Sequence, residues 1–219
     1  HEFQPYSGPF VLDEGIYRVD YRSADIAGNT EPVQSLDVKV DRTAPTFALF
    51  LNGTPAESGM SAEDSQPVVL TVQAADGMSG VAEKTVLVDG AAYEEGTELR
   101  LAGQLGAHAV QVAVRDAAGN EASASFEIQV TTSPASVLAL IAAYEQSGDL
   151  GHSMAAPLAN MMTQAQFHYS SGRTSQALHF LDTFLQHLDV PGQQNNISDA
   201  AKQALQADAL ELKRLWGGL

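Results

Sequence analysis

Carboxylate and amide side chains recur in a five-residue pattern, D-x-A-G-N, at Asp25–Asn29 and again at Asp116–Asn120. A third stretch, Asp76-Gly77-Met78-Ser79-Gly80, adds another carboxylate beside two glycines. Such oxygen atoms are the ligands that Ca²⁺ prefers, because it binds six to eight oxygens from carboxylates, carbonyls and water. The candidate calcium ligands are therefore Asp25, Asn29, Asp76, Asp116 and Asn120.

The same residues also suit tight turns, which is the competing interpretation. Aspartate can accept a hydrogen bond from the backbone two residues on, glycine adopts positive φ, and asparagine tolerates the left-handed region. No D-x-D-x-D-G loop gathers several carboxylates in one short stretch. Bracing of turns is the interpretation that the pattern favours, and calcium binding stays open as the alternative.

Residue patterns that support catalysis do not occur in the sequence. The chain has no cysteine, so it has no disulfide, no thiolate zinc site and no thiol nucleophile. It also has no G-x-S-x-G motif and no glycine-rich phosphate loop. Adjacent acids such as Glu94 and Glu95 would point to opposite faces of a strand and could not flank one bond. We expect that the chain is not an enzyme and has no catalytic residues.

One carboxylate interrupts a predicted helical stripe. Asp208 shares its spacing with the apolar positions 201, 204, 205, 212 and 215. A buried carboxylate must be paired or hydrogen-bonded, so we expect Asp208 to accept a hydrogen bond from His187, His168 or Tyr169. Histidines 168, 179 and 187 lack the H-E-x-x-H or Glu-x-x-His spacing of a metal site. Asp208 and His187 are therefore interpreted as buried structural polar residues.

Glycan recognition would require exposed aromatic side chains. The one tryptophan, Trp216, falls on the apolar stripe of a predicted helix, and most tyrosines alternate into predicted cores. Tyr6 and Tyr93 lie in loop-like stretches, which makes them the candidate ligand-binding residues.

An internal repeat determines where these residues lie. Aligning Gly15 with Gly106 also aligns the two D-x-A-G-N turns, and apolar residues alternate with period two on both sides of each turn. Period two indicates strands with one buried face. The repeat therefore predicts the same β hairpin twice.

The predicted fold class is multidomain all-β plus all-α. Residues 42–131 carry about seven short strand signals, which predicts a complete Ig-like β-sandwich. Residues 1–41 correspond to the C-terminal half of such a repeat, and residues 1–3 resemble a tag remnant. This half repeat must lean on its neighbour, pair with another chain or form a smaller sheet. Beyond Thr131 the apolar spacing becomes helical, which predicts an antiparallel four-helix bundle over residues 134–217.

The charge balance excludes two classes of partner. The chain has 27 acidic and 11 basic residues among 219, a net charge of −16. A surface of this sign repels nucleic acids and anionic lipids. No apolar run approaches the ~18 residues that a membrane span requires, so we expect neither nucleic-acid binding nor membrane insertion.

The residues also resemble known families over nearly the whole chain. Gly15-Ile16-Tyr17, the two D-x-A-G-N turns and Asp41-Arg42-Thr43-Ala44-Pro45 are similar to the Ig-like repeats of secreted and surface proteins of Gram-positive bacteria. The helical part, with Ser147-Gly148-Asp149-Leu150 and the stretch from Ile197-Ser198 to Trp216, resembles the FIMAH domain.

The resemblance implies a non-catalytic C-terminal accessory region of a secreted bacterial enzyme. Such modules are appended to polysaccharide-degrading enzymes of Bacillus and Paenibacillus type, glycoside hydrolases or polysaccharide lyases, and serve spacing, attachment or substrate proximity. The implied partner is an upstream catalytic domain of the same polypeptide, and the implied location is extracellular or at the cell surface. The alternative is a carbohydrate-binding or cell-wall-binding module with a genuine ligand site. No cofactor is expected beyond the calcium considered above.

Overall fold

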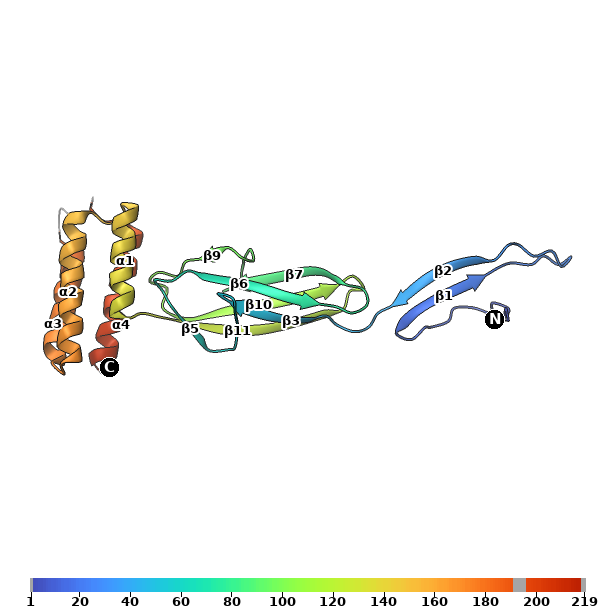
Figure 1. Cartoon of the computed structure of the whole chain (residues 1–219), viewed down its shortest axis with the longest axis horizontal. Helices are drawn as coiled ribbons and strands as arrows, with labels where there is room; N and C mark the ends of the chain where they lie inside the picture. Colours follow the sequence, from blue (N-terminus) through green and yellow to red (C-terminus); the bar gives the residue numbers. More distant parts are fainter. Residues whose placement is uncertain (1, 191–195, 218–219) are drawn as a thin grey trace.

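The computed structural model describes residues 2–190 and 196–217, which form three parts arranged in a row (Figure 1). We call them the N-terminal hairpin (residues 14–40), the β domain (residues 46–131) and the helical domain (residues 134–217), and residues 41–45 form the linker between the first two. Three predicted features, His1 of the tag remnant, the helix break at Pro191-Gly192 and the terminal Gly218, lie outside the described residues.

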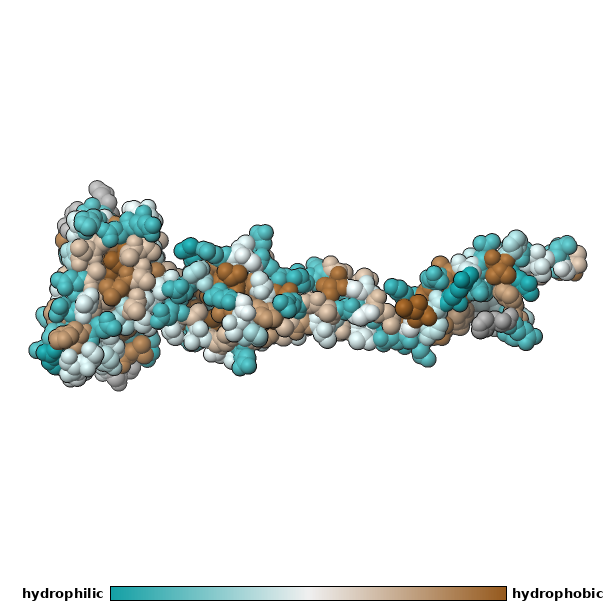
Figure 2. All heavy atoms as spheres, in the orientation of Figure 1, coloured by the Kyte–Doolittle hydropathy of each residue, from teal (hydrophilic) through white to brown (hydrophobic). Residues whose placement is uncertain are grey.

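The N-terminal hairpin is a two-stranded antiparallel sheet. Strands β1 (Gly15–Tyr21) and β2 (Gln34–Val40) pair with Gly15 opposite Val40 and Tyr21 opposite Gln34. No other described strand joins this sheet. Several of its apolar side chains therefore stay exposed, among them Tyr21 at 53% and Leu36 at 57%, and apolar patches are visible along the hairpin in Figure 2.

The β domain contains two sheets. The five-stranded sheet has the order β5-β11-β10-β7-β8, and the four-stranded sheet has the order β4-β3-β6-β9. All pairs are antiparallel except β11 with β5. In chain order the strands are β3 (Thr46–Leu51), β4 (Thr54–Pro55), β5 (Met60–Glu63), β6 (Val68–Ala75), β7 (Val81–Val88), β8 (Ala91–Ala92), β9 (Glu98–Leu99), β10 (Gly106–Asp116) and β11 (Glu121–Thr131).

The core of the β domain lies between the two sheets. The period-two alternation of β10 buries Val110, Val112 and Val114, and these residues belong to one apolar cluster with Leu49 and Leu70 of the other sheet. Burial of each such aliphatic side chain contributes about 1.5–3 kcal/mol. The same alternation was the basis for predicting strands here, and it identifies the buried face of β10 correctly.

Side chains, rather than a long strand, cover the outer edge of β6. The sequence predicts a strand over residues 97–101, but β9 spans only Glu98–Leu99. The Tyr93 hydroxyl accepts a hydrogen bond from the Leu70 amide at 3.0 Å, and a Glu95 carboxylate oxygen accepts one from the Val72 amide at 2.7 Å. These side chains satisfy backbone donors that a neighbouring strand would otherwise satisfy.

The helical domain consists of four helices around one apolar core. They are α1 (Pro134–Ser147), α2 (His152–Ser170), α3 (Thr174–Leu188) and α4 (Asp199–Gly217). Phe184, Leu181, Leu158 and Leu205, from three of these helices, are fully buried in a single cluster that also includes Val137 of α1. None of the described helices combines the length and the apolar character needed to span a membrane.

One helix begins earlier than the sequence predicts. We expect the second helix to begin at residues 155–157 because proline favours the first turn. Instead α2 begins at His152, and Pro157 lies inside it. Met154 and Ala155 are buried in the core, so packing extends the helix upstream despite the hydrogen bond that Pro157 cannot donate.

Candidate functional site

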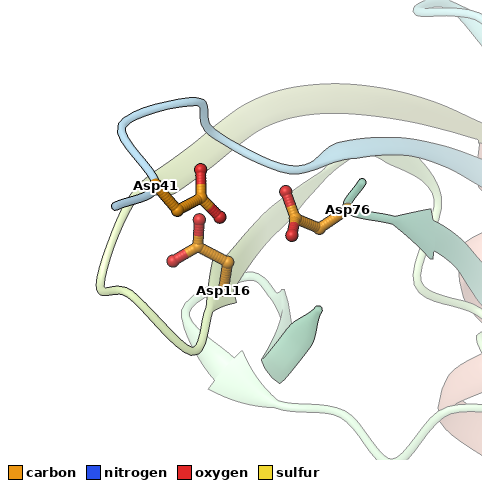
Figure 3. Close-up of side chains that lie close together, drawn as sticks. All are labelled: Asp41, Asp76 and Asp116. Atoms are coloured by element: carbon orange, nitrogen blue, oxygen red, sulfur yellow. The ribbon is translucent and has the colours of Figure 1, made fainter. Parts of the chain in front are cut away.

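Three carboxylates converge at the end of the β domain that faces the N-terminal hairpin. Asp41 lies in the segment between β2 and β3, Asp76 follows β6, and Asp116 ends β10. One oxygen from each lies within 4.8 Å of the others. Figure 3 shows the three side chains close together. Asp116 is buried, and Asp41 and Asp76 are half-buried. We call this group the carboxylate trio.

Tight turns hold two members of the trio in place. Asp76 Oδ1 accepts hydrogen bonds from the amides of Met78 at 3.1 Å and Gly80 at 2.6 Å. Asp116 Oδ1 accepts hydrogen bonds from the amides of Ala118 at 2.9 Å and Asn120 at 2.8 Å. The turn chemistry read from the sequence therefore positions these carboxylates and leaves part of their oxygen surface directed toward Asp41.

Asp41 connects the linker to the β domain through hydrogen bonds. Its Oδ1 accepts a hydrogen bond from the Thr43 amide, and its Oδ2 accepts one from the Ser79 amide, both at 3.0 Å. Asp41 is not among the ligands predicted from the sequence, because it lies far along the chain from Asp76 and Asp116. Its position directly before Arg42-Thr43-Ala44-Pro45, where one module meets the next, is the signal that could have identified it.

The electrostatics of the trio favour a cation. Hydrogen bonds, above all from the Gly80 amide, lower the pKa of Asp76. Burial acts to raise the pKa of Asp116, but hydrogen bonds from Asn120 and the turn amides outweigh it and lower that pKa as well. No described lysine, arginine or histidine forms an ion pair with any of the three. The three carboxylates of the trio therefore have no positively charged partner among the described residues.

The donor set fits a hard divalent cation. Ca²⁺ binds oxygen at about 2.3–2.6 Å, so two of its ligand atoms lie no more than about 5 Å apart. The 4.8 Å limit within the trio satisfies this geometry. Three carboxylates supply part of the six to eight oxygens, and water would complete the shell.

The remaining predicted ligands have other roles. Asp25 Oδ1 accepts from the amides of Ala27 at 2.9 Å and Asn29 at 2.8 Å, which repeats the Asp116 turn. No further carboxylate joins Asp25 and Asn29 in a cluster of the described residues. Asn120 directs its amide NH₂ group to Asp116 Oδ2 at 2.7 Å, so it positions a carboxylate and does not present its oxygen there.

The two candidate glycan residues lie in different surroundings. Tyr93 is half-buried, and its hydroxyl is used by the Leu70 amide and the Thr97 carbonyl, so it supports the β-domain edge. Tyr6 is 76% exposed and, with Phe10 and Tyr21, lines an open hollow of about 780 Å³ beside the hairpin.

Asp208 is fully buried, and the charged group beside it is Asp64 and not one of the predicted hydrogen-bond donors. No described residue donates a hydrogen bond to either of its carboxylate oxygens, so the predicted bonds from His187, His168 and Tyr169 are not formed. Burial, followed by the nearby negative charge of Asp64, raises the pKa of Asp208 to about 8. His187 is half-buried, and its Nε2 also lacks a partner among the described residues.

In comparisons with known proteins, the helical part matches a known domain family. A model of the FIMAH domain family matches residues 134–214. A comparison with curated proteins gives no match. One similar solved structure is described as "Structures of Clostridium thermocellum CbhA fibronectin(III)-like modules", at 22% identity and a TM-score of 0.35, with 55% of this chain and 65% of that chain covered. The chain thus joins a β region to a C-terminal stretch that matches the FIMAH domain.

Proposed function

We propose that this chain is a non-catalytic accessory region of a secreted bacterial enzyme that degrades polysaccharides. In this proposal the β domain is an Ig-like sandwich that acts as a spacer, and the FIMAH domain is an antiparallel four-helix bundle that serves attachment or substrate proximity. The sequence resemblance supports the extracellular enzyme context. The match of residues 134–214 to the FIMAH family supports the assignment of the helical domain.

One observation carries the spacer role: the chain enters and leaves the β domain at opposite ends. Entry is beside the Asp116 turn, where Asn120 Nδ2 donates to the carbonyl oxygens of Asp41 and Thr43 at 3.3 Å. Exit is at Thr131, where β11 continues almost directly into α1. Figure 1 shows the hairpin and the helical domain on either side of the β domain. A domain with its two ends at opposite poles separates its neighbours by its own length.

Calcium bound by the carboxylate trio would stiffen the joint between the hairpin and the β domain. Asp41 belongs to the linker, whereas Asp76 and Asp116 belong to the β domain, so one cation would hold both sides together. Besides the bonds from Asn120 to the linker carbonyls, the linker makes exposed polar contacts with the segment before β1, namely Arg42 to the Leu12 carbonyl at 2.9 Å and Thr43 to Glu14 at 2.7 Å. We therefore propose that the spacer is rigid in calcium and flexible without it.

Distance measurements between spin labels test the spacer. The chain lacks cysteine, so Ile26→Cys in the hairpin and Ala92→Cys in the β domain give two unique attachment sites. We expect a narrow distance distribution in calcium and a broad one in a chelator. The matched control carries Ala92→Cys in the β domain and Ser171→Cys in the helical domain. Its distance distribution should be the same in calcium and in the chelator. A broad distribution for the hairpin pair under both conditions would contradict a rigid spacer.

Calorimetric titration with Ca²⁺ tests the metal site separately. Asp41→Asn and Asp76→Asn each remove one anionic ligand and should weaken binding at least tenfold. Asp25→Asn changes the same kind of turn but lies outside the trio, so its affinity should equal that of the unchanged chain. Equal binding by all three variants would exclude the trio as the site.

The alternative function is a glycan-binding module, and the exposed Tyr6, Phe10 and Tyr21 favour it. The repeat argues against it, because Tyr21 aligns with Val112, which is buried in the core of the β domain. Affinity gels with insoluble glycans distinguish the two functions. Retention on one polymer, lost in Tyr6→Ala, would support the binding module, and equal mobility in all gels is expected for a spacer.

A further inference from the structure

The β domain and the helical domain meet in a buried polar junction. Asp64, directly after β5, is 3% exposed, and Ser136 in the first turn of α1 is fully buried. The Ser136 hydroxyl donates to Asp64 Oδ1 at 2.6 Å, and the Gly103 amide donates to Asp64 Oδ2 at 2.9 Å. Asp64 thus accepts one hydrogen bond from each domain and lies at the centre of the contact.

The backbones of the two domains approach closely at the same place. A Cβ atom added to Gly103 would lie 2.4 Å from the Cα of Ala204 in α4. Ala102 packs against the apolar core of the helical domain. Such contacts leave no room for water between this loop and α4. The junction is therefore a packed interface and not a loose tether.

Asp208 lies one helical turn after Ala204 and carries the polar group that the junction leaves unsatisfied. Both of its oxygens are buried without a hydrogen-bond partner among the described residues. The Thr132 hydroxyl acts to lower the pKa of Asp208, but burial and Asp64 outweigh that effect. Asp64 is the charged group that acts directly on Asp208. An ionised Asp208 would place a second negative charge beside Asp64 in a water-excluded contact, which is strongly unfavourable. A protonated Asp208 would instead donate its O–H to the Asp64 carboxylate.

Among the described residues, no lysine, arginine or histidine forms an ion pair with Asp208. Tyr144 on α1 is half-buried, and its own pKa is raised by burial and then by the charge of Asp208. His187 on α3 lies near the same level of the helix pair, between the ion pairs of Asp182 with Lys213 and Asp189 with Lys202. It makes no hydrogen bond with Asp208. Within the described contact, protonation of Asp208 therefore removes the repulsion between Asp208 and Asp64.

We propose that a single proton shared between Asp208 and Asp64 is a latch that locks the helical domain to the β domain and opens at alkaline pH. While the proton is present, the carboxyl–carboxylate pair bridges α4 to the segment after β5. When the proton leaves, two adjacent buried carboxylates repel one another across the interface. Separation of the domains, which lets water reach both groups, then becomes the less costly arrangement.

A second contact of the same loop responds to pH in the same direction. His108 is 9% exposed; its Nδ1 lies 2.6 Å from Asp89 Oδ2, and its Nε2 lies 2.8 Å from the Gln104 carbonyl oxygen. Burial acts to lower the pKa of His108, but these two acceptors outweigh it and raise that pKa. Protonated His108 therefore anchors the loop that holds Gly103 against α4, and this anchor also weakens as the pH rises.

The test follows the junction in the intact chain. Spin labels at Ala92→Cys and Ser171→Cys report the distance between the domains, and carbon-13 NMR of the aspartate carboxyl groups reports when Asp208 ionises. We expect a narrow distance distribution at pH 6 that broadens with a midpoint near the pH at which Asp208 loses its proton. Far-UV circular dichroism should stay constant, because the helices separate from the β domain without unfolding.

Two variants distinguish the latch from a merely structural carboxyl group. Asp208→Asn keeps a donor toward Asp64 and cannot ionise, so its distribution should stay narrow to pH 10. Asp64→Asn offers a donor to ionised Asp208, and the midpoint for Asp208 ionisation should fall by more than one pH unit. Ionisation of Asp208 near pH 4, equal broadening in Asp208→Asn, or loss of helical signal at the same pH would each overturn the proposal.

Discussion

Replacement of Asp208 by asparagine should remove most of the pH dependence of the helical domain's stability. The free energy of unfolding depends on pH wherever a group binds protons differently in the folded and unfolded states. The pKa of Asp208 rises from 3.8 to about 8 on folding. Because the folded state holds this proton more tightly, the stabilisation is fully present below pH 3.8 and is lost as the pH rises through about 8.

The size of the effect follows from the same shift. A difference of about four pKa units, at about 1.4 kcal/mol per unit, corresponds to at most about 6 kcal/mol between pH 4 and pH 8. This is comparable to the whole stability of many domains, about 5–15 kcal/mol. In the unchanged chain the free energy of unfolding should therefore fall by about 1.4 kcal/mol per pH unit, relative to Asp208→Asn, across this window.

Urea unfolding followed by tryptophan fluorescence measures the difference. The one tryptophan, Trp216, lies in α4 and stacks on Tyr169 with a ring-centroid distance of 4.3 Å, so it reports the helical domain. His108 titrates in both chains, and its contribution cancels in the comparison. Parallel stability curves for the two chains from pH 4 to pH 8 would refute the buried, proton-bound state of Asp208.

Three further substitutions test the packing. Gly103→Ala should broaden the distance distribution between the β domain and the helical domain already at pH 6, because φ is +71° and the added Cβ meets Ala204. Gly53→Ala has a φ of +79° and open space around the added Cβ, so it is the control for backbone strain alone. Equal distance distributions in the two variants would exclude the contact with Ala204. Phe184→Ala should destabilise the helical domain by about 3–5 kcal/mol in the urea assay, whereas Phe167→Ala, 55% exposed, should change it little. Tyr93→Phe leaves the buried Leu70 amide without its acceptor and should destabilise the β domain by about 1–3 kcal/mol. Hydrogen exchange at the Leu70 amide should become faster, and an unchanged exchange rate would show that Tyr93 does not protect this amide.

Periodicity made most of the secondary structure predictable. The alternation around Val110 and Val112 and the helical spacing around Leu181 and Phe184 each reflect one buried face, and the structure buries those faces. The short strands and the start of α2 were not predictable in this way. They depend on distant partners, such as the Leu70 amide that engages Tyr93 or the core that receives Met154.

The candidate functional residues were predictable only in part. Turn chemistry selected Asp76 and Asp116, because an aspartate that caps a turn has a local signature. Asp41 also accepts a hydrogen bond from the amide two residues on, but its approach to Asp116 arises only when the chain folds, as does that of Asp64 to Asp208. The interruption of a helical stripe identified Asp208 as unusual, but a helix pattern contains no information about which domain supplies its partner.

The placement of entry and exit at opposite ends of the β domain has a consequence for how such proteins change over evolution. A duplicated copy can be inserted in tandem at Asp41 without disturbing the contact between the β domain and the helical domain, and each copy adds the same increment of length. The number of copies would therefore adjust how far the helical domain stands from whatever precedes the β domain.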